Sequence, residues 1–179
     1  SFLTQYIEPS PGAFVSVESG AEVGAHRGLE LYTNGQKARI SGASAPWFVA
    51  GKDRTSGTVY VAQGHDHPAL YSDTAVVGDF HWVAGAPPPP VQTAGFRGTF
   101  KARYLQRPGW CALRVTQPSD LPPPSRFCLG GLCEPGQGGG VTADAPLSVR
   151  FDRPVRALTP HQALVLYAGD VCLSAGLLQ

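Results

Sequence analysis

The sequence predicts an all-β protein, with a small central β domain followed by a C-terminal six-stranded-type β-barrel. The 179 residues include 22 glycines and 17 prolines, and only 15% are charged. This composition is too apolar for a disordered chain and too rich in turn formers for a helical one. Short runs of alternating apolar and polar residues recur between turn signals, and no window has the periodicity of an amphipathic helix.

The first domain is expected to span residues 1–72. Residues 1–8 are predicted to be the end of a linker helix, because Pro9 and Pro11 would stop it. A strand is expected at 13–17, and a hairpin should pair 47–50 with 58–62 around a polar turn. The turn-rich segment 63–68 is expected to link the two domains.

The second domain, residues 73–179, is expected to form the barrel. Four consecutive prolines at 87–90 predict a polyproline spacer. Residues 117–146 contain clusters of Pro and Gly and are predicted to be a long exposed insertion. The expected strands lie at 74–83, 94–104, 110–116, 147–152, 163–168 and 171–178.

One predicted strand carries a basic face. From Phe96 to Tyr104 the residues alternate, and between Phe80 and Ser119 there are five basic residues and no acid. Successive strand side chains point to opposite faces, and positive charge without carboxylates suits contact with phosphates. The alternative is the solvated outer face of an ordinary barrel. The outward set is Arg97, Thr99, Lys101, Arg103 and, on the next strand, Arg114; the inward set is Phe96, Gly98, Phe100, Ala102, Tyr104, Cys111, Leu113 and Val115.

Several stretches resemble the tRNA-specific 2-thiouridylase family, in the family's order and over nearly the whole chain. They are GAHRG at 24–28, LYTNGQK at 31–37, PWFV at 46–49, QGHDHPALYS at 63–72, HWV at 81–83, RYLQ at 103–106 with Cys111, FDRPVRALTPHQA at 151–163 and YAGDVCL at 167–173.

The resemblance implies which chemistry the chain lacks. The family joins an ATP-pyrophosphatase domain to a central β domain and a C-terminal barrel, and this sequence resembles only the last two. In the family, ATP adenylates O2 of the wobble uridine and a persulfide sulfur displaces the adenylate. The Ser-Gly-Gly-x-Asp-Ser phosphate loop is absent here, and no cysteine matches a catalytic position. We therefore expect no catalytic residue and no cofactor in this segment; ATP and a sulfur-relay protein would bind the catalytic domain.

The resemblance also implies a tRNA-contacting set in the barrel, namely Arg103, Tyr104 and Gln162. Alternation would turn Tyr104 inward unless the strand ends before it. His161 stands where the family has Gly, which makes the loop geometry beside Gln162 a question for the structure. In the central domain a glycine-bearing loop is expected to contact RNA or the catalytic domain, through Gln36, Lys37 and Arg39.

Two clusters of metal-ligand residue types were weighed as sites. His65 and His67 flank Asp66, but no further ligands are evident, so a turn before Pro68 is expected and no metal. Cys128 and Cys133 lie within the insertion with four residues between them and lack a second ligand pair. Cys111 and Cys172 are expected to be buried as small apolar residues.

The leading hypothesis is therefore the tRNA-binding part of a 2-thiouridylase, with tRNA or another structured RNA as partner and no activity by itself. A rival is a non-catalytic relative that serves as an RNA-binding or structural subunit of a larger ribonucleoprotein, such as an organellar ribosome. A third is a barrel that binds protein.

Three further expectations concern the chain as a whole. It begins Ser-Phe-Leu and has no Met, which favours a processed chain or a fragment. Residues 36–42 are closer to the family's mitochondrial branch, so a mitochondrial location is expected, with cytoplasm or plastid as the alternatives. No apolar run approaches the ~20 residues that span a bilayer, and no membrane partner is expected.

Overall fold

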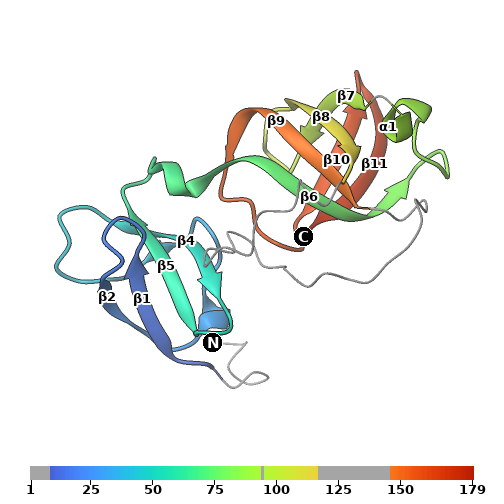
Figure 1. The fold of residues 1–179 in the computed structure, drawn as a ribbon. Coiled ribbons are helices and arrows are strands. Elements are labelled where there is room, and N and C mark those ends of the chain that lie inside the picture. The colour runs from blue at the N-terminus through green and yellow to red at the C-terminus, as the bar shows by residue number, and fades with distance from the viewer. Residues whose placement is uncertain (1–8, 94, 117–145) are drawn as a thin grey trace. The chain divides into compact units, whose positions relative to one another are not determined.

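The structure is a computed structural model that describes residues 9–93, 95–116 and 146–179 (Figure 1). The chain divides into two compact units, with the boundary between Tyr71 and Ser72. Both units consist mainly of strands, which confirms the predicted all-β class. No helix within the described ranges is long and apolar enough to cross a membrane.

The first unit is a five-stranded sheet with the order β2-β1-β5-β4-β3. The pair β1–β5 is parallel and the other pairs are antiparallel. The predicted hairpin is the pair β4–β5, and it closes at Gly57, whose φ of 67° favours glycine. The strands are β1 (Gly12–Ser16), β2 (Glu22–His26), β3 (Lys37–Ala38), β4 (Trp47–Asp53) and β5 (Thr58–Gln63).

The core of the first unit forms because alternate residues of its strands are apolar. Strand side chains point to opposite faces in turn, so one face of β4 and β5 collects the apolar set. A short 3-10 turn, η2 (Leu29–Leu31), adds Leu29 to it. The fully or nearly buried members are Phe14, Leu29, Ala38, Trp47, Val49, Val59 and Val61.

The second unit is a closed six-stranded barrel with the order β10-β11-β6-β9-β8-β7, which confirms the predicted barrel. The long strand β6 enters it directly from the 3-10 turn η3 (Pro68–Leu70) and is drawn in green in Figure 1. The strands are β6 (Tyr71–Trp82), β7 (Phe96–Lys101), β8 (Gly109–Val115), β9 (Leu147–Arg156), β10 (Ala163–Ala168) and β11 (Val171–Leu178).

Alternation along the barrel strands produces one apolar interior. A closed sheet of this size is filled by the side chains that point inward. The interior includes Val77, Phe100, Cys111, Leu113, Val149, Phe151, Leu164, Leu166 and Leu178, all at most 4% exposed.

Two sequence expectations in the barrel were wrong. The prolines at 87–90 do not form an extended spacer, because the short helix α1 (Pro89–Thr93) begins among them and buries Val91. Proline is tolerated in the first turn of a helix, where its missing N–H has no partner to lose. Cys172 is exposed instead of buried, because the β10–β11 register shifts at Tyr167, close to the turn.

Other expectations fall outside the described residues. They are the linker helix at 1–8, the insertion at 117–146 apart from Pro146, and the cysteine pair Cys128 and Cys133.

Candidate nucleic-acid interface

The basic face predicted from the sequence lies on the outside of the barrel. In β7, Arg97 and Lys101 alternate with the buried Gly98 and Phe100, and Thr99 lies between the two cations. In β8, Cys111 and Leu113 point inward and are at most 1% exposed. The predicted alternation is therefore confirmed from residue 96 to residue 101 and along β8.

The third strand of this face contributes both a base and an acid. The registered pairs place Arg97 opposite Ala112, and Ala112 opposite Arg150 of β9. Asp152, two residues further along β9, forms an ion pair with Arg97. Residues 80–119 contain no acid, but the closed barrel brings Asp152 of β9 against Arg97 of this stretch.

Arg97 also packs against an aromatic ring. Its guanidinium carbon lies 5.6 Å from the centroid of the Trp110 ring, within the range of a cation–π contact. Asp152 holds the same guanidinium by charge. Trp110 and Asp152 therefore hold the Arg97 side chain in position, and Asp152 partly neutralises its charge. Arg97 is less available to a phosphate than the sequence suggested.

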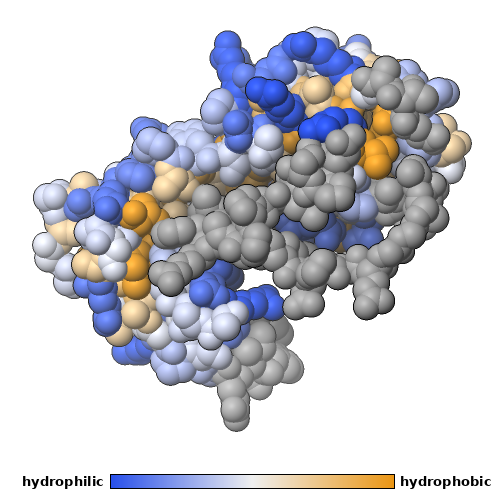
Figure 2. Space-filling view, viewed as in Figure 1, coloured by the Kyte–Doolittle hydropathy of each residue, from blue (hydrophilic) through white to orange (hydrophobic). Residues whose placement is uncertain are grey.

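Two other cations on this face, Lys101 and Arg150, are more available. The side chains of Lys101 and Arg150 form no hydrogen bond or ion pair with any residue that the structure describes. Arg114 is exposed and faces Ser148 across the β8–β9 register. Among the described residues, outward positions of β7, β8 and β9 thus carry Arg97, Lys101, Arg114 and Arg150 together with the acid Asp152. In Figure 2, strongly hydrophilic residues lie beside hydrophobic ones over the barrel.

Beyond Lys101 the strand gives way to a turn, which changes the expected roles of Arg103 and Tyr104. The amide of Gln106 donates to the carbonyl of Arg103 (3.1 Å), and the Gln106 side chain accepts from the amide of Ala102 (3.0 Å). Alternation therefore stops before Tyr104. Strict alternation would turn Tyr104 inward, but the strand ends before it, and its side chain is 92% exposed.

Arg103 ties this turn to the segment between β9 and β10. Its Nη2 donates to the carbonyls of Arg156 (2.8 Å) and Ala157 (2.7 Å). Ala157 has a φ of 52°, so the bridged carbonyls belong to a sharply bent backbone. Arg103, which was expected to contact tRNA, thus links two turns of the barrel through its side chain. The same side chain remains exposed.

The loop that carries Gln162 has His161 in a left-handed backbone conformation, at the position where the resemblance implies a glycine. His161 has a φ of 63°, in the left-handed region that histidine enters more readily than most residues. Its amide donates to the carbonyl of Leu178 (2.8 Å), and the amide of Gln162 donates to Thr159 (3.2 Å). The Thr159 hydroxyl in turn contacts the Ala157 carbonyl that Arg103 holds. The structure thereby links the turns of Arg103 and Gln162 at one end of the barrel.

The side chain of Gln162 has an unused acceptor. Its Oε1 is buried and has no hydrogen-bond partner among the described residues. An unsatisfied buried acceptor costs about 1–3 kcal/mol.

The three residues predicted to contact RNA or the catalytic domain from the first unit, Gln36, Lys37 and Arg39, are all exposed, but Gln36 already accepts a hydrogen bond within its own turn. Gln36 is used by its own turn, since its Oε1 accepts from the amide of Thr33 (3.0 Å). Lys37 lies in β3, which pairs with β4 at the edge of the sheet, and both Lys37 and Arg39 are exposed. Two solvent-facing cations therefore remain at this sheet edge.

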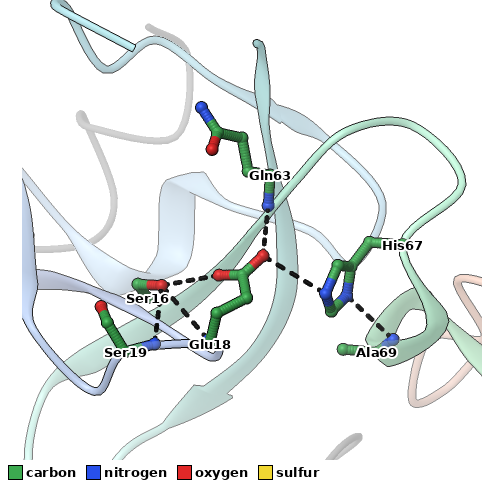
Figure 3. A network of polar contacts seen from close by, with 6 residues as sticks. All are labelled: Ser16, Glu18, Ser19, Gln63, His67 and Ala69. Atoms are coloured by element: carbon green, nitrogen blue, oxygen red, sulfur yellow. Dashed lines mark hydrogen bonds and ion pairs between the residues drawn. The ribbon is translucent and has the colours of Figure 1, made fainter. Parts of the chain in front are cut away.

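The histidine cluster serves as a turn. His67 precedes η3 and its Nδ1 accepts from the amide of Ala69 (3.1 Å), while Nε2 lies 3.2 Å from Glu18 (Figure 3). His65 pairs with the neighbouring Asp66 at 2.7 Å. No group of three possible metal ligands occurs among the residues described.

Sequence reasoning missed part of the barrel face. Arg150 and Asp152 could have been found, because Leu147, Val149 and Phe151 alternate with them and point inward. The proximity of Trp110 to Arg97 depends on strand pairing, which the sequence does not state.

The two units define a class of protein by their matches to family models. Residues 1–63 match the tRNA methyl transferase PRC-barrel domain, and residues 140–178 match the Aminomethyltransferase beta-barrel domain. In chain order, the two matches therefore describe a PRC-barrel unit followed by a β-barrel.

Curated relatives identify the family within that class. The chain is 39% identical over 99% of its length to the tRNA-specific 2-thiouridylase MnmA of Burkholderia thailandensis. It is 40% identical over 99% to that of Burkholderia pseudomallei, and 39% identical over its whole length to that of Protochlamydia amoebophila. The chain belongs to the tRNA-specific 2-thiouridylase family. It spans about two-fifths of the length of these relatives, 41%, 41% and 40% respectively.

Proposed function

We propose that this chain is the tRNA-binding part of an enzyme that 2-thiolates the wobble uridine of tRNA. The supporting observation is the basic outer face of β7, β8 and β9, on which Lys101 and Arg150 have no partner within the described ranges. Unpaired surface cations on adjacent strands suit a backbone of regularly spaced phosphates. The names of the relatives fit such a substrate.

The remaining chemistry is placed outside this chain. ATP, the adenylated uridine and the sulfur donor belong to a catalytic domain that the 179 residues do not contain. We propose that this segment binds no cofactor and works within a longer enzyme, in a mitochondrial setting. Incubating the chain with tRNA, ATP and a sulfur donor should yield no 2-thiouridine; turnover by the chain alone would contradict this assignment.

A salt titration of tRNA binding tests the RNA-binding role. Each phosphate neutralised contributes roughly 0.7 to 0.9 to the slope of log K against log salt. Replacing Lys101 and Arg150 together by Ala should therefore flatten the slope by about 1.4 to 1.8 and weaken binding. Arg54→Ala is the matched control, because Arg54 lies in the exposed β4–β5 turn of the other unit. Equal slopes for wild type and the double variant would show that this face does not hold tRNA.

A further inference from the structure

Five side chains form a cross on the outside of the barrel, with Thr99 at its centre. Across the strands, Thr99 of β7 pairs with Trp110 of β8 on one side and with Tyr167 of β10 on the other. Along β7, Arg97 and Lys101 lie two residues away in either direction. Neighbouring strands are about 4.8 Å apart and two residues advance about 7 Å. Two aromatic residues and two cations thus surround a small threonine.

All of these residues belong to the outer surface. Leu164 and Leu166 of β10 are fully buried, so the alternate residue Tyr167 faces outward. Trp110 is 56% exposed, whereas Trp47 and Trp82 are only 9% and 8% exposed. The Trp110 indole lies on the outer face beside Arg97 and therefore does not contribute to the apolar interior of the barrel.

The Trp110 ring is held in place. Arg97 lies over it at 5.6 Å, and Asp152 fixes Arg97 from β9. A ring that is already positioned loses little conformational freedom when a ligand stacks on it. Asp152 pairs with Arg97. Lys101, on the other side of Thr99 along β7, is therefore not neutralised by Asp152 and can contact an anion.

This combination selects the chemistry of the ligand. Planar rings beside cations match a nucleotide, since the base stacks on the aromatic and the phosphate meets the cation. Bases in an RNA duplex already stack on one another, whereas unpaired bases can be splayed onto a protein ring. An acidic peptide would use the cations but not the aromatic pair.

We propose that Trp110 and Tyr167 form a stacking site for unpaired nucleotides of RNA, flanked by Arg97 and Lys101 as phosphate contacts. The site rests on the proposed tRNA-binding function and specifies how one region of this face recognises its ligand. It recognises single-stranded RNA with little dependence on sequence, because every base offers a π-face.

Tryptophan fluorescence provides a direct test on the 179-residue chain. Titration with a short oligouridine should quench the exposed Trp110, whereas the buried Trp47 and Trp82 respond little. The Trp110→Phe variant should lose the quenching but keep most of the affinity, because the phenyl ring still stacks. An equal change of fluorescence in Trp110→Phe would overturn the proposal, and so would tighter binding of duplex RNA than of oligouridine.

Affinity measurements separate this site from the general basic face. Loss of one base–aromatic stack lowers affinity by about 5- to 140-fold, so Trp110→Ala and Tyr167→Ala should each weaken oligouridine binding on that scale. Val83→Ala is the control, since Val83 is 68% exposed and follows β6, two strands away from β10. If Trp110→Ala binds RNA as tightly as wild type while the Lys101/Arg150 variant is impaired, the stacking site fails and the proposed function stands. If RNA binds to none of these proteins, the proposed function fails as well.

Discussion

His67 and Glu18 form a contact that joins the last turn of the first unit to the end of β1. The His67 Nδ1 accepts from the Ala69 amide, so its Nε2 carries the proton and points at Glu18 Oε1, 3.2 Å away. The same oxygen accepts from the amide of Gln63 (3.1 Å), and Oε2 accepts from the hydroxyl of Ser16 (2.6 Å). One carboxylate therefore holds β1, β5 and the exit of the chain from this unit (Figure 3).

Replacing Glu18 by Gln should destabilise the first unit by about 1–2 kcal/mol. Hydrogen bonds to a charged group contribute about 1.5–3 kcal/mol, less where the group is partly exposed, as Glu18 is. Burial raises the pKa of Glu18, but the bonds from Ser16 and the amide of Gln63 outweigh it and leave the pKa below 4.5. The contribution is therefore present above about pH 4.5 and is lost as the pH falls below it. Urea unfolding of both proteins at pH 7 and pH 3 measures the difference, which should shrink at pH 3.

Two substitutions of His67 separate its two contacts. Asparagine caps short helical turns well but does not reach Glu18, so His67→Asn should keep the amide of Ala69 protected from hydrogen exchange. His67→Ala removes both contacts and should expose that amide. Equal protection in the two variants would show that the cap at η3 does not depend on this side chain.

Arg103 and Tyr104 should behave differently although they are neighbours in the sequence. Arg103→Ala removes the donor to the carbonyls of Arg156 and Ala157, so the barrel should lose about 1–3 kcal/mol of stability. Tyr104 is 92% exposed, so Tyr104→Ala should change stability by less than about 0.5 kcal/mol. Thermal unfolding measures both.

A tRNA-binding assay on the same two variants distinguishes a structural role from contact with RNA. An affinity loss in Tyr104→Ala at unchanged stability would identify Tyr104 as a contact. If Arg103→Ala unfolds at the wild-type temperature, the link between the two turns is not important for the fold.

Much of this architecture could be read from local patterns, and the exceptions have physical causes. Alternation located the interior of the barrel through residues such as Phe100 and Cys111, because strand periodicity is a local property. It failed at Tyr104, because the strand ends where Gln106 closes a turn. Cys172 was misplaced for a similar reason, since a register shift near a turn has no signature in apolar spacing.

Partnerships across strands were the harder part of the site to predict. The sequence indicated Arg97 as a free cation, because no acid lies near it along the chain. The closed barrel brings Asp152, 55 positions away, into contact with it. The same closure places Trp110 and Tyr167 on either side of Thr99. Such pairings depend on strand order and register, which composition and spacing do not determine.

His161→Gly should leave the barrel as stable as the wild type or slightly more stable. Glycine removes the left-handed strain of about 1–2 kcal/mol but costs about 0.5–1 kcal/mol through the freedom of the unfolded chain. His161→Val places a β-branched residue at a φ of 63° and should lower the melting temperature clearly. A valine variant that melts with the wild type would mean that the loop does not need this conformation.

Cys111 should resist alkylation while Cys172 reacts. Burial, assisted by Asp152, raises the pKa of the Cys111 thiol from 9.0 to about 12, and only the thiolate is nucleophilic. Iodoacetamide at pH 8 followed by peptide mass analysis should label Cys172 and leave Cys111 unmodified until the barrel unfolds. Because the folded pKa is raised, the stability due to the neutral thiol is full below about pH 9 and declines as the pH rises toward 12. Cys111→Ala should reduce this alkaline loss of stability.

Asp152→Asn should strengthen RNA binding, because it removes the acid that pairs with Arg97 on the basic face and frees the charge of Arg97. If the freed guanidinium meets one more phosphate, the slope of log K against log salt should steepen by roughly 0.7 to 0.9. Asp170→Asn is the control for net charge, since Asp170 lies in the exposed β10–β11 turn.

The gain should depend on Arg97 itself. In a double-mutant cycle, Asp152→Asn in an Arg97→Ala background should raise affinity no more than Asp170→Asn does. An equal gain with and without Arg97 would mean that Asp152 acts through the general field of the face. A loss of affinity in the single variant would mean that Asp152 is needed to hold Arg97 over Trp110. In that case RNA binding depends more on the position of the Arg97 side chain over Trp110 than on its charge.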